Sequence, residues 1–248
     1  MELFQVYKLR QTLSEYFGHN INVAHSFMSL TDGNSTIYYV MSYGDSAILV
    51  YNEYWEYQRL VNLTESPAFS AYSNNQIFIT GDYGISIYDK YLNFKSKLNN
   101  LTDKFRGIYV NEKIFAAAPY LYQVLQFDQN LTLFPSYNLL KMPRCVFEHN
   151  YLLLVGTYTE TIYVYKDYEL IQNITTVCVN GAFSILFDNY NHMLILCDTT
   201  VYVYHTNGTN TGITMPVCTN LGGQALYMNF DSKDRLIITC QSGISIYY

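Results

Sequence analysis

One five-residue segment occurs twice in the chain without a single change. Gly84–Tyr88 reads Gly-Ile-Ser-Ile-Tyr, and the same residues stand at Gly243–Tyr247. Related pairs of segments, each an apolar run followed by an alternating run, recur along the rest of the chain. The apolar runs begin 37 to 43 residues apart, at Ile37, Ile77, Ile114, Leu152, Met193 and Leu236. An internal repeat of this length constrains the fold more than any other feature of a sequence.

Each repeat has the pattern of four short strands. The apolar run predicts a strand buried on both faces, and the alternating run after it predicts a half-buried strand. A shorter strand is expected before each pair and a polar outer strand after it, as at Phe94–Leu98. A period near 40 residues with four antiparallel strands is typical of a propeller blade. The sequence therefore predicts an all-β fold, a six-bladed β-propeller formed by residues 1–248 as one domain with almost no helix.

The last repeat stops at its third strand, at Tyr248. Met1–Leu9 has the pattern of the missing outer strand, so we expect the N-terminal segment to complete the C-terminal blade. Such closure pairs both ends of the chain within one sheet. It also removes an open sheet edge that could otherwise pair with another molecule.

The repeat that contains the first identical segment resembles an NHL-type blade. In that pattern a polar turn leads to an apolar strand ending in Asp, then to a short turn, a strand and a second Asp. Asn74–Asp89 follows it with Asp82 at the strand end, and Asp188–Tyr204 follows it with Asp198 there. Three other repeats carry Pro, Thr or Gln at this place. The resemblance implies the propeller fold far better than it implies a function.

The composition excludes several classes of protein. Half of the residues are hydrophobic and only 14% are charged, so the chain is too apolar to be disordered. No apolar run approaches the roughly 18 residues of a transmembrane helix, and we expect no membrane insertion. A formal net charge of −6 with 14 Lys and Arg argues against nucleic acid as a partner. Packing between blades is the expected use of most of the 27 Tyr residues.

Six Asn-x-Ser/Thr sequons favour a secreted glycoprotein. Most fall beside a predicted outer strand, on the exposed rim of the blades, where a glycan would fit. The alternative is that a chain rich in Asn and Thr produces sequons by chance. No signal peptide is visible, so an extracellular location implies a mature domain or part of a larger chain or assembly. The predicted sites are Asn34, Asn62, Asn100, Asn130, Asn173 and Asn207.

Four of the five cysteines occupy repeating positions. Cys178 and Cys218 precede innermost strands, and Cys197 and Cys240 end the next strands. These two places lie on the same face of one blade. Of the three pairings that four cysteines allow, only Cys178–Cys197 with Cys218–Cys240 respects the repeat. Cys145 falls in an innermost strand and is expected to be a free, buried thiol. The alternative is that all five are small buried side chains.

The mouth of the central channel is the expected ligand site, because the loops that enter the innermost strands meet there. Arg106 and Arg144 hold equivalent places in two repeats and could together bind a carboxylate or phosphate. His25 is the histidine best placed for chemistry, near Asp82 and Asp198. The alternatives are internal ion pairs for the arginines, turn capping for the carboxylates and a buried structural histidine.

Ca²⁺ is the one cofactor that the sequence suggests. Asp45, Asp82 and Asp198 hold the same place in three repeats, and carboxylates gathered at the mouth could ligate this cation. No Cys-x-x-Cys or His/Cys cluster is present, so a cysteine metal site is not expected.

An aromatic turn is the second candidate for recognition. Tyr54, Trp55 and Tyr57 fall at an outer turn, where a core role is least natural. Tyr and Trp are favoured at binding surfaces, so these three residues are expected to form a surface patch.

Together these features favour a non-catalytic recognition or scaffolding propeller, extracellular, that binds a protein or glycan through one face. No Gly-x-Ser-x-Gly, phosphate-binding loop or His-Glu-x-x-His motif is present. The alternative is a small-molecule hydrolase or lyase with a metal-assisted site in the channel, around Asp82, Asp198 and His25. A structural module of a larger extracellular assembly is a third possibility.

Overall fold

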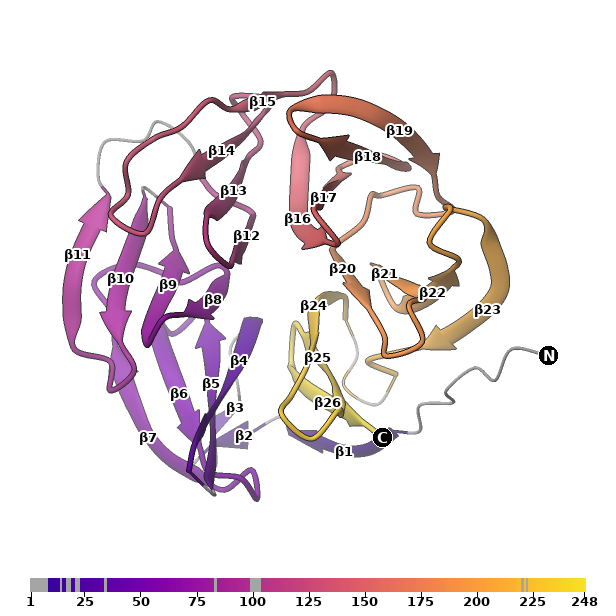
Figure 1. Ribbon diagram of the computed structural model, residues 1–248. Coiled ribbons are helices and arrows are strands. Elements are labelled where there is room, and N and C mark those ends of the chain that lie inside the picture. The colour runs from indigo at the N-terminus through magenta and orange to yellow at the C-terminus, as the bar shows by residue number, and fades with distance from the viewer. Residues whose placement is uncertain are drawn as a thin grey trace.

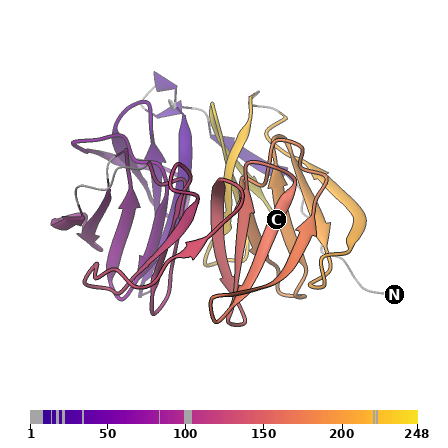
Figure 2. The same ribbon diagram turned by 90° about the horizontal axis from the view of Figure 1, so that it is seen from above.

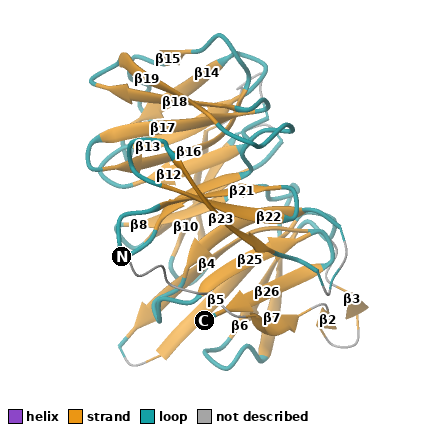
Figure 3. Cartoon of the chain, turned by 90° about the vertical axis from the view of Figure 1, so that its right-hand side faces the viewer, coloured by secondary structure: helices purple, strands orange, loops and turns teal. Residues whose placement is uncertain are grey.

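Six antiparallel sheets stand in a ring around a central channel (Figure 1). The computed structural model describes residues 9–13, 15–16, 19–20, 23–33, 35–82, 84–98, 104–219, 221 and 223–248. Every regular element in this part of the chain is a strand, and none is a helix (Figure 3). The prediction of an all-β, six-bladed propeller with four strands per blade is confirmed. None of the described residues forms a helix that could cross a membrane.

Each blade has an innermost strand beside the channel, two middle strands and an outer strand. Blade 1 contains β4 (Ala24–Asp32), β5 (Ser35–Ser42), β6 (Ala47–Tyr51) and β7 (Tyr57–Asn62). Blade 2 contains β8 (Ser70–Ser73), β9 (Gln76–Thr80), β10 (Ile85–Asp89) and β11 (Phe94–Leu98). Blade 3 contains β12 (Gly107–Val110), β13 (Ile114–Ala118), β14 (Gln123–Phe127) and β15 (Tyr137–Asn138).

The other three blades follow the same plan. Blade 4 contains β16 (Pro143–His149), β17 (Leu152–Thr157), β18 (Thr161–Lys166) and β19 (Glu169–Thr175). Blade 5 contains β20 (Ser184–Phe187), β21 (Met193–Cys197), β22 (Thr200–Tyr204) and β23 (Asn210–Pro216). Blade 6 contains β24 (Ala225–Phe230), β25 (Leu236–Cys240) and β26 (Gly243–Tyr247). A short hairpin, β2 (Glu15–Tyr16) and β3 (His19–Asn20), precedes blade 1.

An N-terminal strand completes the C-terminal blade. β1 (Leu9–Leu13) pairs antiparallel with β26, so the predicted ring closure is confirmed. The predicted end at Leu9 is wrong, because the strand runs over Leu9–Leu13; residues 1–8 lie outside the described residues. An outer strand pairs on one side only, so its pattern specifies its position weakly.

The middle strands form the core of each blade. All five residues of β13, β21 and β25 are buried, as their apolar sequences predict. The outer strands β11, β19 and β23 are mostly exposed or half-buried. Tyr38, Tyr51 and Tyr204 are among the largest fully buried side chains, so part of the tyrosine excess packs between the sheets; other Tyr residues, such as Tyr91 and Tyr151, are exposed.

The two identical segments need their glycines for different reasons. A Cβ on Gly84 would lie 2.0 Å from the carbonyl oxygen of Leu98, so only glycine lets β10 and β11 approach. Gly243 has a φ of 147°, a backbone conformation that side chains disfavour.

The loops gather at two faces of the ring, and the strands run between them (Figure 2). We call the face where the chain enters the innermost strands the mouth face; it holds His25, Arg106 and Arg144. The opposite face holds the turns that leave the innermost and third strands. At five of these turns an Asp or Asn side chain accepts the backbone N–H groups two and four residues later. These residues are Asn52, Asp89, Asp128, Asp188 and Asp231.

Both predicted disulfides are present. Cys178 is bonded to Cys197 in blade 5, and Cys218 is bonded to Cys240 in blade 6. Cys145 is a free, buried cysteine, also as predicted. Two disulfides fit an oxidising environment. Both hold loops at the mouth face.

Candidate functional site

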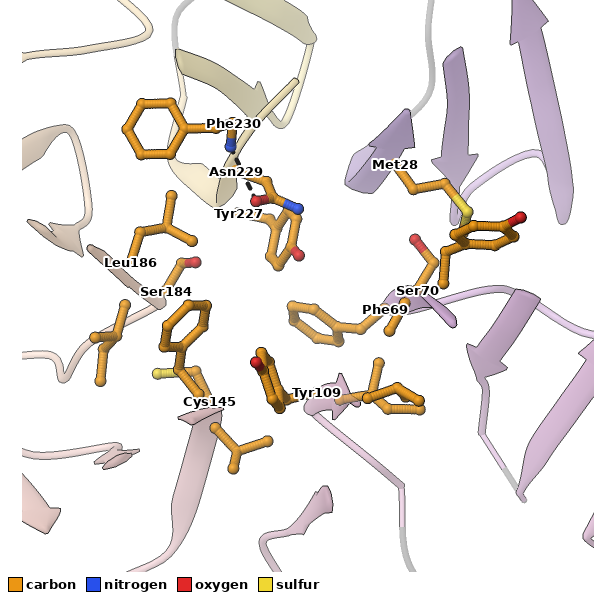
Figure 4. A pocket seen from close by; sticks show the side chains of 18 of the residues that line it. Met28, Phe69, Ser70, Tyr109, Cys145, Ser184, Leu186, Tyr227, Asn229 and Phe230 are labelled. Carbon is orange, nitrogen blue, oxygen red and sulfur yellow. Dashed lines mark hydrogen bonds between the residues drawn. The ribbon is translucent and has the colours of Figure 1, made fainter. Parts of the chain in front are cut away.

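The innermost strands of all six blades line a cavity of about 280 Å³. Phe69, just before β8, and Tyr227, in β24, both point into it (Figure 4), with their ring centroids 6.0 Å apart in an edge-to-face arrangement. His25 also contacts Phe69, with centroids 6.0 Å apart, but does not line the cavity. Phe69 therefore contacts both the histidine of the mouth and the cavity.

The cavity itself contains no activated nucleophile. Cys145 lines it, but burial raises the pKa of this thiol to about 12, and its Sγ donates to the carbonyl of Ala182. Burial likewise raises the pKa of Tyr227 to about 12. Both groups are protonated at neutral pH, so neither acts there as a thiolate or phenolate nucleophile.

The mouth brings three of the predicted site residues together. His25, at the start of β4, stacks on Tyr43 with ring centroids 4.7 Å apart. Burial lowers the pKa of His25 to about 4; Arg106 lowers it further, and Asp82 acts in the opposite direction. Among the described residues, no group forms a hydrogen bond with the buried Nδ1 of His25. The imidazole is thus neutral at pH 7, and the charges of Arg106 and Asp82 both act on it.

Arg144 lies on the same face, held by aromatic rings and a backbone carbonyl. Its guanidinium carbon is 3.1 Å from the ring centroid of Phe183 and 4.8 Å from that of Tyr158. It donates to the carbonyl of Asn180 at 2.6 Å. Burial lowers the pKa of Arg144 to about 10, and the charge of Arg106 also lowers it. Two guanidiniums whose charges act on each other could together hold an anion or an oxygen carrying partial negative charge, which stays a prediction.

The two carboxylates of the predicted site have partners of their own. Asp82 forms an ion pair with Lys104 at 3.1 Å. Asp198 accepts hydrogen bonds from Asn180 at 3.0 Å and from Gln224 at 2.5 Å. Sequence reasoning missed Lys104, Asn180 and Gln224, although each lies in a loop that it assigned to the mouth.

The carboxylates at the mouth do not form a metal site. Asp45 accepts a hydrogen bond from Ser42, in a blade other than those of Asp82 and Asp198. Within the described parts of the chain, no three His, Cys, Asp or Glu side chains are grouped so that they could hold a metal ion. The expectation of Ca²⁺ at the mouth stays a prediction for which these residues supply no ligand set.

The predicted aromatic patch is wrong for Trp55. Trp55 is only 5% exposed and stacks on Tyr38, with ring centroids 4.1 Å apart. Asn52 accepts the N–H groups of Tyr54 and Glu56, and the resulting turn places Trp55 at a φ of 64°, facing inward. Tyr54 is 72% exposed, whereas Tyr57 is half-buried against Tyr51.

Four predicted glycosylation sites can be placed. All four are exposed, in outer strands or in the turns that lead to them: Asn62, Asn130, Asn173 and Asn207. Asn34 and Asn100 lie outside the described residues. The exposed sites are accessible to a glycan, and their occupancy stays a prediction.

No family model matches the chain, and no curated protein matches it. Solved structures, in contrast, match the chain over almost its whole length. A streptogramin B lyase has a TM-score of 0.72 and 9% identity, over 98% of this chain and 97% of that one. Virginiamycin B lyase from Staphylococcus aureus, as a catalytically inactive histidine-to-alanine variant with quinupristin, has a TM-score of 0.73 and 11% identity, over 98% and 99%. At such identities the likeness shows the fold, a six-bladed propeller.

These structural neighbours are enzymes, and they correct the function that the sequence favoured. A non-catalytic recognition propeller is contradicted by neighbours that are small-molecule lyases. The alternative, a hydrolase or lyase, agrees with them. Recognition was favoured by the missing catalytic motifs and by the aromatic turn at Tyr54–Tyr57. Absence of a motif is a weak argument in a propeller, whose mouth residues come from separate repeats.

Proposed function

We propose that this propeller is a small-molecule lyase or hydrolase that acts at the mouth of its central channel. The observation that carries the proposal is a neutral His25 beside Arg106, on the face that also holds Arg144. A neutral imidazole can accept a proton, and guanidiniums can stabilise negative charge that develops on oxygen. The lyases with the same fold support this choice of chemistry, and one of them is inactive without a histidine.

In an elimination, His25 would accept a proton from a substrate carbon. The electron pair of that C–H bond forms a carbon–carbon double bond, and the breaking C–O bond leaves its pair on an oxygen held by Arg106 or Arg144. In a hydrolysis, His25 would instead accept the proton of a water that attacks a carbonyl. An anionic group bound near Arg106 would offset the charge that lowers the pKa of His25, and would so strengthen the base.

The test uses quinupristin together with simple lactones and esters as substrates, and mass spectrometry as the readout. Elimination opens a lactone ring without changing its mass, whereas hydrolysis adds one water. We expect His25→Gln to lose at least about a hundredfold in turnover. His149→Gln, on the opposite face, is the matched control and should keep the wild-type rate. Full activity in folded His25→Gln, or no turnover of any substrate by the wild type, would reject the proposal.

We also propose that the protein works outside the cell, or in a secretory lumen, as a glycoprotein. The two disulfides and the four exposed sequons support this location. The NHL-type classification of the blades stays a proposal that rests on the pattern at Asn74–Asp89. Mass spectrometry of protein from its native source would detect the glycans, and unmodified sequons with reduced cysteines would contradict the location.

A further inference from the structure

A second cavity lies between blades 1 and 2, which are neighbours in the ring (Figure 1). Its volume is about 440 Å³, larger than that of the channel cavity. One wall comes from β4, β5, β6 and β7 of blade 1. The other comes from the turns β8–β9 and β10–β11 of blade 2. These turns belong to the opposite face, so the cavity, which we call the inter-blade cleft, is separate from the mouth.

The floor of the inter-blade cleft is apolar. Leu30 and Val50 are buried there, and the ring of Tyr39 is only 3% exposed. The Tyr39 hydroxyl donates to the carbonyl of Lys90 at 3.0 Å, so this buried side chain leaves no unsatisfied polar atom in the floor. At the rim, Tyr91 is 62% exposed. A flat apolar group could therefore pack between a buried and an exposed tyrosine.

The rim of the cleft carries an excess of positive charge. The Arg59 guanidinium has one long hydrogen bond, 3.5 Å, to the carbonyl of Tyr91. No carboxylate among the described residues forms an ion pair with Arg59. Lys90 pairs with Asp32 at 3.0 Å, and these two charges cancel. Within the described part of the chain, the cleft thus holds a guanidinium without a carboxylate partner above an apolar floor.

We propose that the inter-blade cleft binds a small organic anion that carries a flat apolar ring, such as an aryl carboxylate, sulfonate or phosphate. Arg59 binds the anionic group, since a guanidinium offers paired donors to planar oxygens. The ring lies over Tyr39 beside Tyr91. The volume falls within the range of known small-molecule sites, about 300 to 1,000 Å³. This site is independent of the reaction proposed at the mouth.

The test titrates the folded protein with 1-anilinonaphthalene-8-sulfonate, an aryl sulfonate whose fluorescence rises in apolar surroundings. Arg59→Gln should weaken its affinity by about tenfold, the loss expected for one charge-assisted hydrogen-bond pair. Lys166→Gln is the matched control, because it removes one exposed cation from blade 4. It should leave the affinity unchanged. The uncharged analogue 1-anilinonaphthalene should not distinguish Arg59→Gln from the wild type.

A measurement on the wild type makes the test independent of how the variant folds. Nuclear Overhauser contacts should connect the bound probe with the rings of Tyr39 and Tyr91, and benzoate should compete for the site. Equal affinity of folded Arg59→Gln and wild type, or contacts to Phe69 and Tyr227 of the channel instead, would overturn the proposal.

Discussion

The two faces of the propeller are built in different ways. At the opposite face, five turns repeat one local device, in which an Asp or Asn such as Asp128 holds the backbone two and four residues later. At the mouth face, the contacts join different blades: Asn180 bonds both Arg144 of blade 4 and Asp198 of blade 5, and Gln224 bonds Asp198 from blade 6. The repeated device fixes the blades, and the irregular face is free to carry chemistry.

The largest effect is expected at the Asp231 turn of the opposite face, where the carboxylate of the turn itself bonds a side chain of the next blade. Asp231 accepts a 2.6 Å bond from Arg235 and a 3.1 Å bond from Tyr38, and its side chain is fully buried. Asp231→Ala leaves the buried Arg235 without a counter-ion. It should lower the free energy of unfolding by about 3 to 5 kcal/mol, measured by urea titration. If the free energy of unfolding falls by less than in a variant of another turn, such as Asn52→Ala, Arg235 has found another partner.

The next effect is expected at the mouth face, where a disulfide replaces the local turn device. Cys218–Cys240 spans 22 residues in sequence, and closing a loop of that size contributes about 3 kcal/mol. The double variant Cys218→Ala with Cys240→Ala should lose about this much in urea titration. The equivalent pair in blade 5 is the matched comparison, since its span is 19 residues. No loss in either variant would contradict the idea that the mouth loops need covalent support.

The fold could be predicted because its information is repeated. The spacing of the repeats and the order of the strands within them predict the six blades. Equivalent positions in two repeats were enough to predict the pairing of Cys178 with Cys197. The convergence of His25 with Arg106 and Asp82 also followed from equivalent places, because topology brings the same position of every blade to one face. Prediction was weaker for the outer strand that closes the ring, which is paired on one side only.

Features that occur once could not be predicted. Trp55 was expected at the surface because nothing in the pattern shows that Asn52 bends its turn and directs the indole inward. No sequence pattern predicts the inter-blade cleft, because Tyr39, Arg59 and Lys90 come from three separate segments with different sequence neighbours. The choice between recognition and catalysis also depended on sites assembled across blades, which a repeat pattern does not describe.

A smaller effect is expected at the mouth face, where His25 should make the stability of the fold depend on pH. Folding lowers the pKa of His25 from 6.5 to about 4, so the unfolded chain binds the proton more tightly. Stability from this histidine is therefore complete above pH 6.5 and is lost as the pH falls toward 4, by about 2 to 3 kcal/mol. His25→Gln should flatten the pH dependence of stability in this window. A parallel dependence in wild type and variant would show that other groups cause it.

The smallest effect tests the turn device itself. Asn52 is the only one of the five residues that is not Asp, and its turn holds the only Trp of the chain. Asn52→Ala removes two side-chain bonds to the backbone and should cost about 1 kcal/mol. Emission of Trp55 should shift to the red as the indole gains water. Asn52→Asp keeps the acceptor for both backbone bonds and should keep the emission, but it loses the 2.8 Å bond that the Asn52 amide donates to Glu56 and so should recover only part of the stability. If Asn52→Ala leaves the emission unchanged, packing on Tyr38 rather than the turn holds the indole inside.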